Sequence, residues 1–285
     1  MSVKKKICIL CLILVGAVLL SLVGLLWYRA DWRFRLWNAI RIYPKPDLEE
    51  IKLSNLEEVS FDRAQSLDGW KETLLLVNEK HPLPKDFVPV LAEYNGAKMH
   101  PEMVEAYAAL RDALEKKTGE RIYVSADFRT AEEQKKILEE KGLEVAAAVG
   151  CSEHEAGLAL DVYVKGYGGM SFLKSKSGRE IARICSDYGF IIRYPEGKED
   201  VTGMSYEPWH LRYVGQPHAR IIMDSGLTLE EYLELLEVGV WYITEDYFVG
   251  RFDSESIKLP SGLSDICTIS PDNTGYYVVT VRRYD

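Results

Sequence analysis

A long uncharged stretch near the N-terminus restricts the fold of this chain more than any other feature. Residues Ile7 to Trp27 are almost wholly apolar and contain no charged side chain. About 20 such residues span the core of a bilayer as a helix, whereas a secretory signal peptide usually has an apolar region of about 7–15 residues. The run ends in Trp27-Tyr28-Arg29, which suits the membrane interface better than a cleavage site. We therefore expect a tail over residues 1–6 and a transmembrane anchor over residues 7–27, rather than a cleaved signal peptide.

The basic residues beside this segment do not decide its orientation. Lys4 to Lys6 precede it, but Arg29, Arg33, Arg35 and Arg41 follow it, so a count of basic residues favours neither side. The N-terminal tail is too short to hold a domain, and long C-terminal domains can translocate despite flanking charge. We expect a single-pass protein of the cell membrane with its folded part on the extracellular face, an expectation that the substrate class inferred below also supports.

The rest of the chain has the composition of an ordinary folded protein. Its 285 residues allow one or two domains and a sizeable core. The net charge of -9 argues against nucleic acid as a partner, because phosphate binding needs a basic surface. Outside the apolar run the cysteines are Cys151, Cys185 and Cys267, with no close pair, so no disulfide framework is expected. A metal role for Cys151 is conceivable, but a small packed residue is the favoured interpretation.

Changes in sequence texture divide the chain. Pro44-Lys45-Pro46 interrupts any helix that follows the apolar run, which predicts a stalk over residues 28–68. Short apolar runs from Trp70 onward predict a packed domain over residues 69–236. The remaining residues, 237–285, are rich in β-forming side chains around a turn at Pro271 to Gly275, which predicts a small β appendage.

The packed domain mixes helical and extended patterns. Thr130-Ala131-Glu132-Glu133 fits a capping box that opens a helix ending at Gly142. Alternation over residues 158–164 predicts a strand with one packed face. Helices are predicted over 101–119, 130–142, 178–188 and 228–236, and strands over 122–124, 158–164 and 210–214. The expected fold class is α+β, with a small antiparallel sheet and flanking helices.

Four residues in two short segments carry the most specific chemistry. Residues 152–161 read S-E-H-E-A-G-L-A-L-D, and residues 207–210 read E-P-W-H. The imidazoles of His154 and His210 and the carboxylate of Asp161 can fill three positions of a tetrahedral zinc ion and leave the fourth to water. Glu207 stands three residues before His210 and is near enough to accept a proton from that water. Gly157 permits the turn that brings His154 back beside Asp161.

These two motifs, in this order, resemble the VanY-type D-alanyl-D-alanine carboxypeptidases of the lysostaphin/D-Ala-D-Ala-peptidase/hedgehog group of zinc proteins. The resemblance covers about residues 70–220. It implies one catalytic zinc ion per chain, held by His154, Asp161 and His210, with Glu207 as the catalytic base. The sequence contains no metalloprotease motif of the H-E-x-x-H type, so the histidine ligands and the glutamate base come from two separate segments instead of one helix.

The resemblance also implies residues that bind the substrate. Arg129 matches the family's substrate-binding arginine, and its guanidinium is suited to hold a terminal carboxylate. Gln134 matches the glutamine that follows this arginine, and Ser152 matches the serine that opens the first motif. Trp209 suits either a core position or a stacking surface, and we count it among the substrate-binding residues. The family's usual S-G-Y-R-S reads A-D-F-R-T at residues 126–130, which leaves fine substrate preference open.

Some polar residues have a simpler expected role. His81, His100 and His218 lie outside the motifs and are expected to be structural. Glu153 and Glu155 flank His154 in the first motif and are expected to be solvated.

Together these features predict a zinc carboxypeptidase that removes the terminal D-alanine from peptidoglycan stem pentapeptides ending in D-Ala-D-Ala. Zinc polarises a carbonyl and lowers the pKa of bound water towards neutrality. In relatives such trimming contributes to glycopeptide-antibiotic resistance. Two alternatives remain open: an L,D-carboxypeptidase acting on tetrapeptide stems, and a degenerate, non-catalytic module that binds the cell wall.

Overall fold

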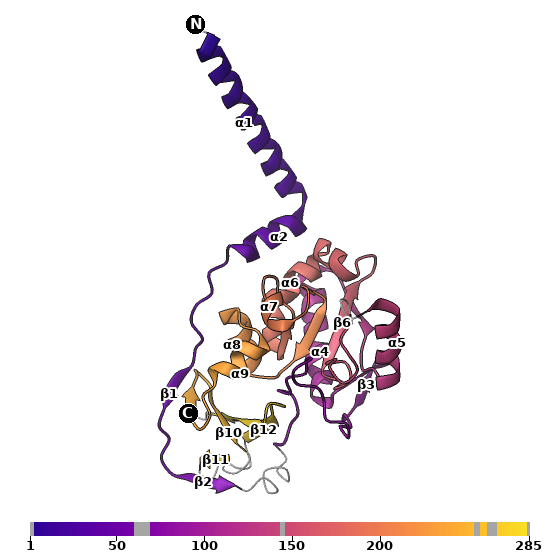
Figure 1. Ribbon diagram of the computed structural model, residues 1–285, viewed down its shortest axis with the longest axis vertical. Coiled ribbons are helices and arrows are strands. Elements are labelled where there is room, and N and C mark those ends of the chain that lie inside the picture. Colours follow the sequence, from indigo (N-terminus) through magenta and orange to yellow (C-terminus); the bar gives the residue numbers. More distant parts are fainter. Residues whose placement is uncertain (1–2, 60–68, 143–145, 254–256, 261–266, 284–285) are drawn as a thin grey trace.

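The computed structural model describes residues 3–59, 69–142, 146–253, 257–260 and 267–283. Helix α1 (Val3–Tyr28) projects away from the folded body, and the shorter helix α2 (Ala30–Ala39) lies between the two (Figure 1). The segment Lys4–Leu25 has a mean hydropathy of 3.0, and none of it is buried within the protein. This segment is therefore long and apolar enough to cross a membrane, properties that an N-terminal signal sequence would share.

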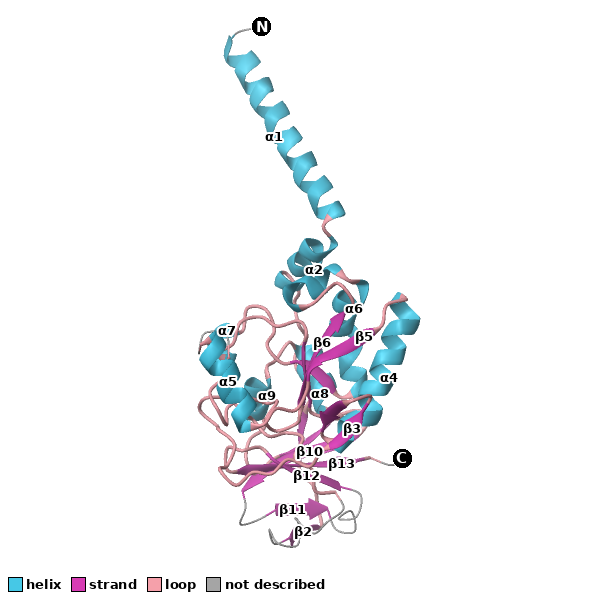
Figure 2. Cartoon of the chain, turned by 90° about the vertical axis from the view of Figure 1, so that its right-hand side faces the viewer, coloured by secondary structure: helices cyan, strands magenta, loops and turns pink. Residues whose placement is uncertain are grey.

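The two sequence motifs end in a four-stranded antiparallel sheet with the strand order β5-β6-β8-β7. Its strands are β5 (Ile122–Ala126), β6 (Ala159–Val164), β8 (His210–Tyr213) and β7 (Phe190–Ile192). Helix α4 lies on one side of β5 and β6, and helix α5 lies on the other (Figure 2). The observed mixture of helices and antiparallel strands confirms the predicted α+β character.

Helices and a hairpin surround this sheet. They are β3 (Ala92–Tyr94), β4 (Ala97–Met99), α4 (Pro101–Thr118), α5 (Ala131–Lys141), η1 (Gly169–Lys174), α6 (Lys176–Ile184), η2 (Cys185–Tyr188), α7 (Glu199–Thr202), α8 (His218–Ser225) and α9 (Leu229–Leu235). The capping box predicted at Thr130 and Glu133 is present, and a second one, at Thr228 and Glu231, opens α9. Reciprocal bonds of this kind satisfy backbone N–H groups that the first turn of a helix leaves unpaired.

One face of the sheet is closed by α4 and α6, and the other carries the catalytic motifs. Along β6 the residues Leu160, Val162 and Val164 are buried, whereas Asp161 and Tyr163 between them are half-buried. Side chains alternate across a strand, so Asp161 points away from the helices. The core beneath the sheet is apolar and includes Met103, Leu110, Leu114, Ile122, Ile181, Phe190 and Leu211.

A second, five-stranded antiparallel sheet occupies the C-terminal region, with the order β1-β9-β10-β13-β12. Its strands are β1 (Glu49–Ile51), β9 (Trp241–Ile243), β10 (Tyr247–Asp253), β13 (Tyr276–Arg282) and β12 (Cys267–Pro271). The predicted turn at residues 271–275 joins β12 to β13, where Asp272 accepts hydrogen bonds from the backbone of Thr274 and Tyr276. This sheet shares a core with the catalytic domain through Leu76, Ile191, Ala219, Leu233, Val249 and Val278.

The structure corrects the expected stalk over residues 28–68. Strand β1 pairs with β9, and strand β2 (Leu56–Val59) pairs with β11 (Ile257–Pro260), so part of the segment is built into the C-terminal β region. Residues 60–68 of the expected stalk lie outside the described residues. The local sequence is charged and carries little β pattern. Its strands form because partners far along the chain supply the backbone hydrogen bonds.

Candidate metal centre and active site

Neighbouring strands bring the candidate metal ligands together. Asp161 on β6 lies directly opposite His210 on β8 in the strand register. His154 comes from the loop before β6, which turns at Gly157 with φ of +69°. A Cβ atom at this position would lie 2.6 Å from the side chain of Leu91, so both the backbone angle and the space favour glycine. The predicted role of Gly157 in the turn is therefore confirmed.

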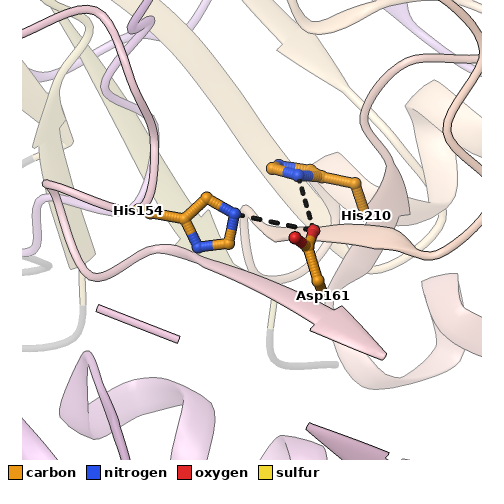
Figure 3. A group of neighbouring side chains, drawn as sticks. All are labelled: His154, Asp161 and His210. Carbon is orange, nitrogen blue, oxygen red and sulfur yellow. Dashed lines mark ion pairs between the residues drawn. The ribbon is translucent and has the colours of Figure 1, made fainter. Parts of the chain in front are cut away.

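The three side chains point toward one another (Figure 3). Asp161 Oδ1 lies 3.0 Å from His210 Nδ1 and 3.5 Å from His154 Nε2, and the three ligand atoms lie within 4.8 Å of one another. Ligands at about 2.0–2.2 Å from a tetrahedral zinc ion are about 3.3–3.6 Å apart, which is close to these separations. Asp161 Oδ1 is buried but makes no hydrogen bond of acceptable geometry within the described part of the chain. A buried carboxylate oxygen that lies between two imidazole nitrogens and lacks a hydrogen bond fits a cation.

The outer nitrogen of each imidazole is occupied. His154 Nδ1 donates to the backbone oxygen of Asp127 at 2.8 Å, which leaves Nε2 available toward Asp161. His210 Nε2 lies 3.4 Å from Glu153 Oε2, which leaves Nδ1 available. Outer contacts of this kind fix the tautomer and orientation of a metal-binding histidine.

Charge and burial shift the pKa values of these groups in different directions. Burial lowers the pKa of His154. Burial also opposes the charged form of His210, but Asp161, Glu153 and Glu207 outweigh it and raise the pKa of His210 to about 9. Asp161 is likewise buried, yet the two imidazoles hold its carboxyl pKa well below the usual range. The carboxylate of Asp161 is therefore ionised, and its negative charge favours a cation at this site.

Behind His210 lies a buried charge network that the sequence did not reveal. Glu153 Oε1 accepts hydrogen bonds from Arg193 Nε and Arg212 Nη1, each at 2.6 Å. Arg193 also donates to both carboxylate oxygens of Glu230, at 2.9 and 2.6 Å. The side chains of Glu153 and both arginines are 0% exposed. Burial opposes ionisation of Glu153, but the charges of Arg212 and Arg193 prevail and hold its pKa well below the usual range.

The expectation that Glu153 and Glu155 are solvated was wrong. Glu153 is 1% exposed, and Glu155 is 7% exposed with its carboxylate accepting a hydrogen bond from the backbone of Gly150 at 2.8 Å. The arginines that compensate Glu153 come from β8 and from the residue after β7, far away in the sequence. No sequence pattern near the first motif predicts that these arginines contact Glu153.

A cavity of about 180 Å³ contains every predicted site residue. Its lining includes the candidate base Glu207, the candidate ligands, and the candidate substrate-binding residues Arg129, Gln134, Ser152 and Trp209. Glu207 Oε2 lies 3.7 Å from His210 Nδ1, so the carboxylate stands beside the metal-ligand cluster. The fold thus brings together residues from the two motifs, from the segment before the first motif and from the segment between them.

Arg129 faces this cavity. Its Nη2 lies 3.5 Å from Asp161 Oδ2, and its Nη1 donates to Gln134 Oε1 at 3.3 Å. Gln134 is 1% exposed and anchors itself by donating to the backbone oxygen of Ala147 at 2.7 Å. The carboxylate of Asp127, a departure from the usual motif, instead accepts a hydrogen bond from the backbone of Lys98 at 2.6 Å.

The cavity lining also includes residues outside the predicted site, among them Tyr194 and Met204. The ring centroid of Tyr194 lies 4.8 Å from that of His210, and Met204 lines the same cavity. Neither has a signature in the sequence, because both follow β7 in a segment without a recognisable motif.

The remaining histidines have structural contacts. His100 caps α4 by accepting from the backbone of Glu102 at 3.3 Å. His218 bridges Tyr232 and Thr280 at 2.6 and 3.0 Å, and His81 contacts Asn78 at 3.1 Å. The metal-ligand group found among the described residues does not include Cys151.

Comparison with known proteins agrees with this geometry. The sequence signature of the VanY family, described as D-alanyl-D-alanine carboxypeptidase, matches residues 96–216. A D-alanyl-D-alanine carboxypeptidase of Enterococcus faecium is 32% identical over 266 residues, covering 84% of this chain and 84% of that protein. The bifunctional D-Ala-D-Ala dipeptidase and D-Ala-D-Ala carboxypeptidase VanXYC of Enterococcus gallinarum is 39% identical over 184 residues, covering 58% and 95%.

Solved structures share the fold. The D,D-dipeptidase VanXYg, in complex with a D-Ala-D-Ala phosphinate analog, matches with a TM-score of 0.64 at 27% identity, covering 81% of this chain and all (100%) of that one. A mutant of the D,D-pentapeptidase VanY in complex with Zn(II) gives 0.52 at 33% identity, covering 56% and 98%. The LD-carboxypeptidase LdcB gives 0.54 at 31% identity, covering 69% and 99%. Because the similarity to curated relatives extends over most of their length and includes the segments that build the cavity, this chain belongs to the VanY family of D-alanyl-D-alanine carboxypeptidases.

Proposed function

We propose that this carboxypeptidase removes the terminal D-alanine from peptidoglycan stem pentapeptides with the help of one zinc ion held by His154, Asp161 and His210. The observation that carries the proposal is the meeting of these ligand atoms in a cavity that Glu207 and Arg129 also line. The VanY structure with Zn(II) supports the choice of metal. A VanY structure in complex with D-Ala-D-Ala, from a protein 32% identical to this chain, supports the choice of substrate.

Each side chain has a defined task in this proposal. Bound zinc supplies a Lewis acid that polarises the scissile carbonyl and lowers the pKa of water. Glu207 accepts the proton of the attacking water and delivers it to the leaving amine of D-alanine. Arg129, positioned by Gln134, holds the terminal carboxylate, and this requirement for a free C-terminus makes the enzyme an exopeptidase. Ser152 and Trp209 complete the wall of the substrate pocket.

The proposal is tested by supplying tri-, tetra- and pentapeptide stems to the purified protein and identifying the released residue by mass spectrometry. Release of one D-alanine from the pentapeptide is expected. The similarity to LdcB, which is an LD-carboxypeptidase, supports a second candidate function, cleavage of the tetrapeptide stem. Turnover of the tetrapeptide but not of the pentapeptide would select that candidate, and no turnover of either, together with absent zinc, would indicate a non-catalytic module.

Replacement of Arg129 by alanine should lower kcat/KM for peptides with a free C-terminus by roughly 10–150-fold. The loss corresponds to about 1.5–3 kcal/mol for a charge-assisted hydrogen-bonded pair. The comparison substrate is the same peptide with an amidated C-terminus, which already lacks the negative charge. Equal losses on both substrates would mean that Arg129 only supports the cavity, through its contacts with Asp161 and Gln134.

The membrane arrangement is also part of the proposal. Helix α1 anchors the chain over residues 7–27, and the catalytic unit over residues 69–236 faces the outside of the cell, where stem peptides are found. The apolar span of α1 supports an anchor, since none of it is buried within the rest of the protein. The described strands within residues 237–285 then form a β region that packs against the catalytic unit and pairs with β1.

Removal of residues 1–28 should release the protein from the membrane and leave its turnover of a soluble pentapeptide intact. None of the removed residues lines the candidate site cavity. The measurement is kcat/KM of the truncated and full chains on the same peptide. A folded truncated chain without turnover would show that the anchor is part of the enzyme.

A further inference from the structure

Helix α2 presents apolar side chains in two opposite directions. Phe34 faces the folded body and is 7% exposed. Trp32 and Leu36 are four residues apart on one face of α2, and Ile40, the residue that caps the C-terminal end of the helix, continues the same spacing. At 100° per residue this face lies opposite Phe34. The three side chains of this apolar stripe (Trp32, Leu36 and Ile40) are 45, 48 and 60% exposed, so the described part of the protein leaves about half of each uncovered.

The position of α2 follows from its connection to α1. The apolar segment of α1 ends at Leu25, and α2 begins at Ala30. Five residue steps extend over at most about 18 Å. If α1 spans the bilayer, α2 therefore starts beside the headgroups. Both views of the molecule place α2 between α1 and the folded body (Figures 1 and 2).

The residues around the apolar stripe are those of a membrane interface. Tryptophan is enriched at the boundary between lipid and water because its ring is amphipathic. The guanidinium of Arg29 lies over the ring of Trp32, 4.6 Å from its centroid. Arg33 and Arg41 are exposed on and just after the same helix, so positive charge lies close to the apolar face. Basic side chains beside an apolar helix face favour a surface of anionic headgroups.

The opposite side of α2 is tied to the catalytic domain. Arg35 Nε donates to Glu196 Oε1 at 2.7 Å, and Phe34 is buried. Glu196 stands two residues after Tyr194, which lines the candidate site cavity. Helix α2 therefore contacts the segment that shapes the cavity through one face and exposes its other face outside the protein.

We propose that α2 lies in the interfacial layer of the bilayer, with Trp32, Leu36 and Ile40 inserted among the lipids, and thereby fixes the orientation of the catalytic domain above the membrane. This inference rests on the proposed anchoring of the chain by α1. Its consequence is that the cavity is held in one orientation relative to substrates presented at the membrane, rather than turning freely on a tether.

Fluorescence quenching by lipids brominated near the headgroup end of their chains tests the insertion directly. The full chain is reconstituted in vesicles, and the quenched tryptophan emission is compared among wild type, Trp32→Phe and Trp241→Phe. Trp241 is 3% exposed and lies in the C-terminal sheet. We expect Trp32→Phe to remove a measurable share of the quenched emission and Trp241→Phe to leave it unchanged. An identical quenched amplitude in Trp32→Phe and wild type would overturn the proposal, whether the stripe is covered by a second copy of the chain or by water.

A charge placed on the stripe tests the orienting role. Leu36→Glu should lower turnover of a lipid-linked pentapeptide in the same vesicles severalfold and leave turnover of a soluble pentapeptide unchanged. The matched control is Val88→Glu, because Val88 is an exposed apolar residue (80%) away from α2. Equal turnover of the lipid-linked substrate by Leu36→Glu and Val88→Glu would contradict the orienting role. Absence of soluble turnover in the wild type would instead refute the proposed function, while the quenching result would still decide where α2 lies.

Discussion

Replacement of Glu207 by glutamine should lower kcat at least a hundredfold while the protein keeps about one zinc ion per chain. Glutamine preserves the shape and hydrogen-bonding capacity of the side chain but cannot accept a proton. General base catalysis contributes about 10²–10⁴-fold to a rate. Glu207 Oε2 lies 3.7 Å from His210 Nδ1, beside the candidate ligands but outside the group of three.

The matched variant is His210→Ala, which removes a candidate ligand and should lose both the metal and the activity. Kinetics on a pentapeptide and metal analysis of the same samples measure the two effects separately. A near-native kcat for Glu207→Gln would exclude this carboxylate as the base. Loss of zinc from that variant would instead make Glu207 a metal ligand.

Replacement of Glu153 by glutamine should lower the free energy of unfolding by about 3–5 kcal/mol. Its carboxylate is the acceptor for Arg212 Nη1 and Arg193 Nε, and all three side chains are fully buried. Arg193 retains the negative charge of Glu230, whereas the other described acceptors of Arg212 are the neutral backbone oxygens of Thr73, Leu75 and Tyr213, so this arginine loses its anionic partner. An uncompensated buried charge has a large desolvation cost.

The same substitution should weaken zinc binding by about 10–100-fold, because Glu153 also contacts the outer nitrogen of His210. The control is Glu155→Gln, a neighbouring buried carboxylate whose described partners are backbone N–H groups rather than arginines. Glutamine retains an oxygen that can accept from these N–H groups, so the substitution should cost at most about 0.5–1.5 kcal/mol and leave zinc affinity unchanged. Unfolding curves and competition with a chelator give the two quantities. Equal effects of the two variants would show that the network around Glu153 has no special role in either stability or metal binding.

Glu153 and Glu155 stand on either side of His154 but differ in the partners of their carboxylates. Both glutamates flank His154, and both are buried. Burial raises the pKa of Glu155, for which a backbone N–H is the main compensation. Glu153 is held ionised by two arginines from distant parts of the chain. Two glutamates that are two residues apart therefore have pKa values shifted in opposite directions, and the local sequence does not distinguish them.

The sequence by itself determined those features whose cause is local. The apolar segment, the capping boxes of α5 and α9, and the turn at Gly157 each depend on residues within a few positions of one another. Strand alternation also placed Asp161 on the face away from the helices. The specific spacing within the two motifs was enough to choose the candidate ligands and the base, which the fold brings into one cavity.

Only the tertiary structure decided the features whose partners lie far along the chain. Strands β1 and β2 form because β9 and β11 supply their hydrogen-bond partners, although their own sequences are charged. Tyr194 joins the cavity, and α2 docks through Phe34 and Arg35, without any local signature. Glu153 is buried because two arginines converge on it from β8 and from the residue after β7. In each case the stabilising interaction joins residues that the sequence separates widely, so their contact exists only once the chain has folded.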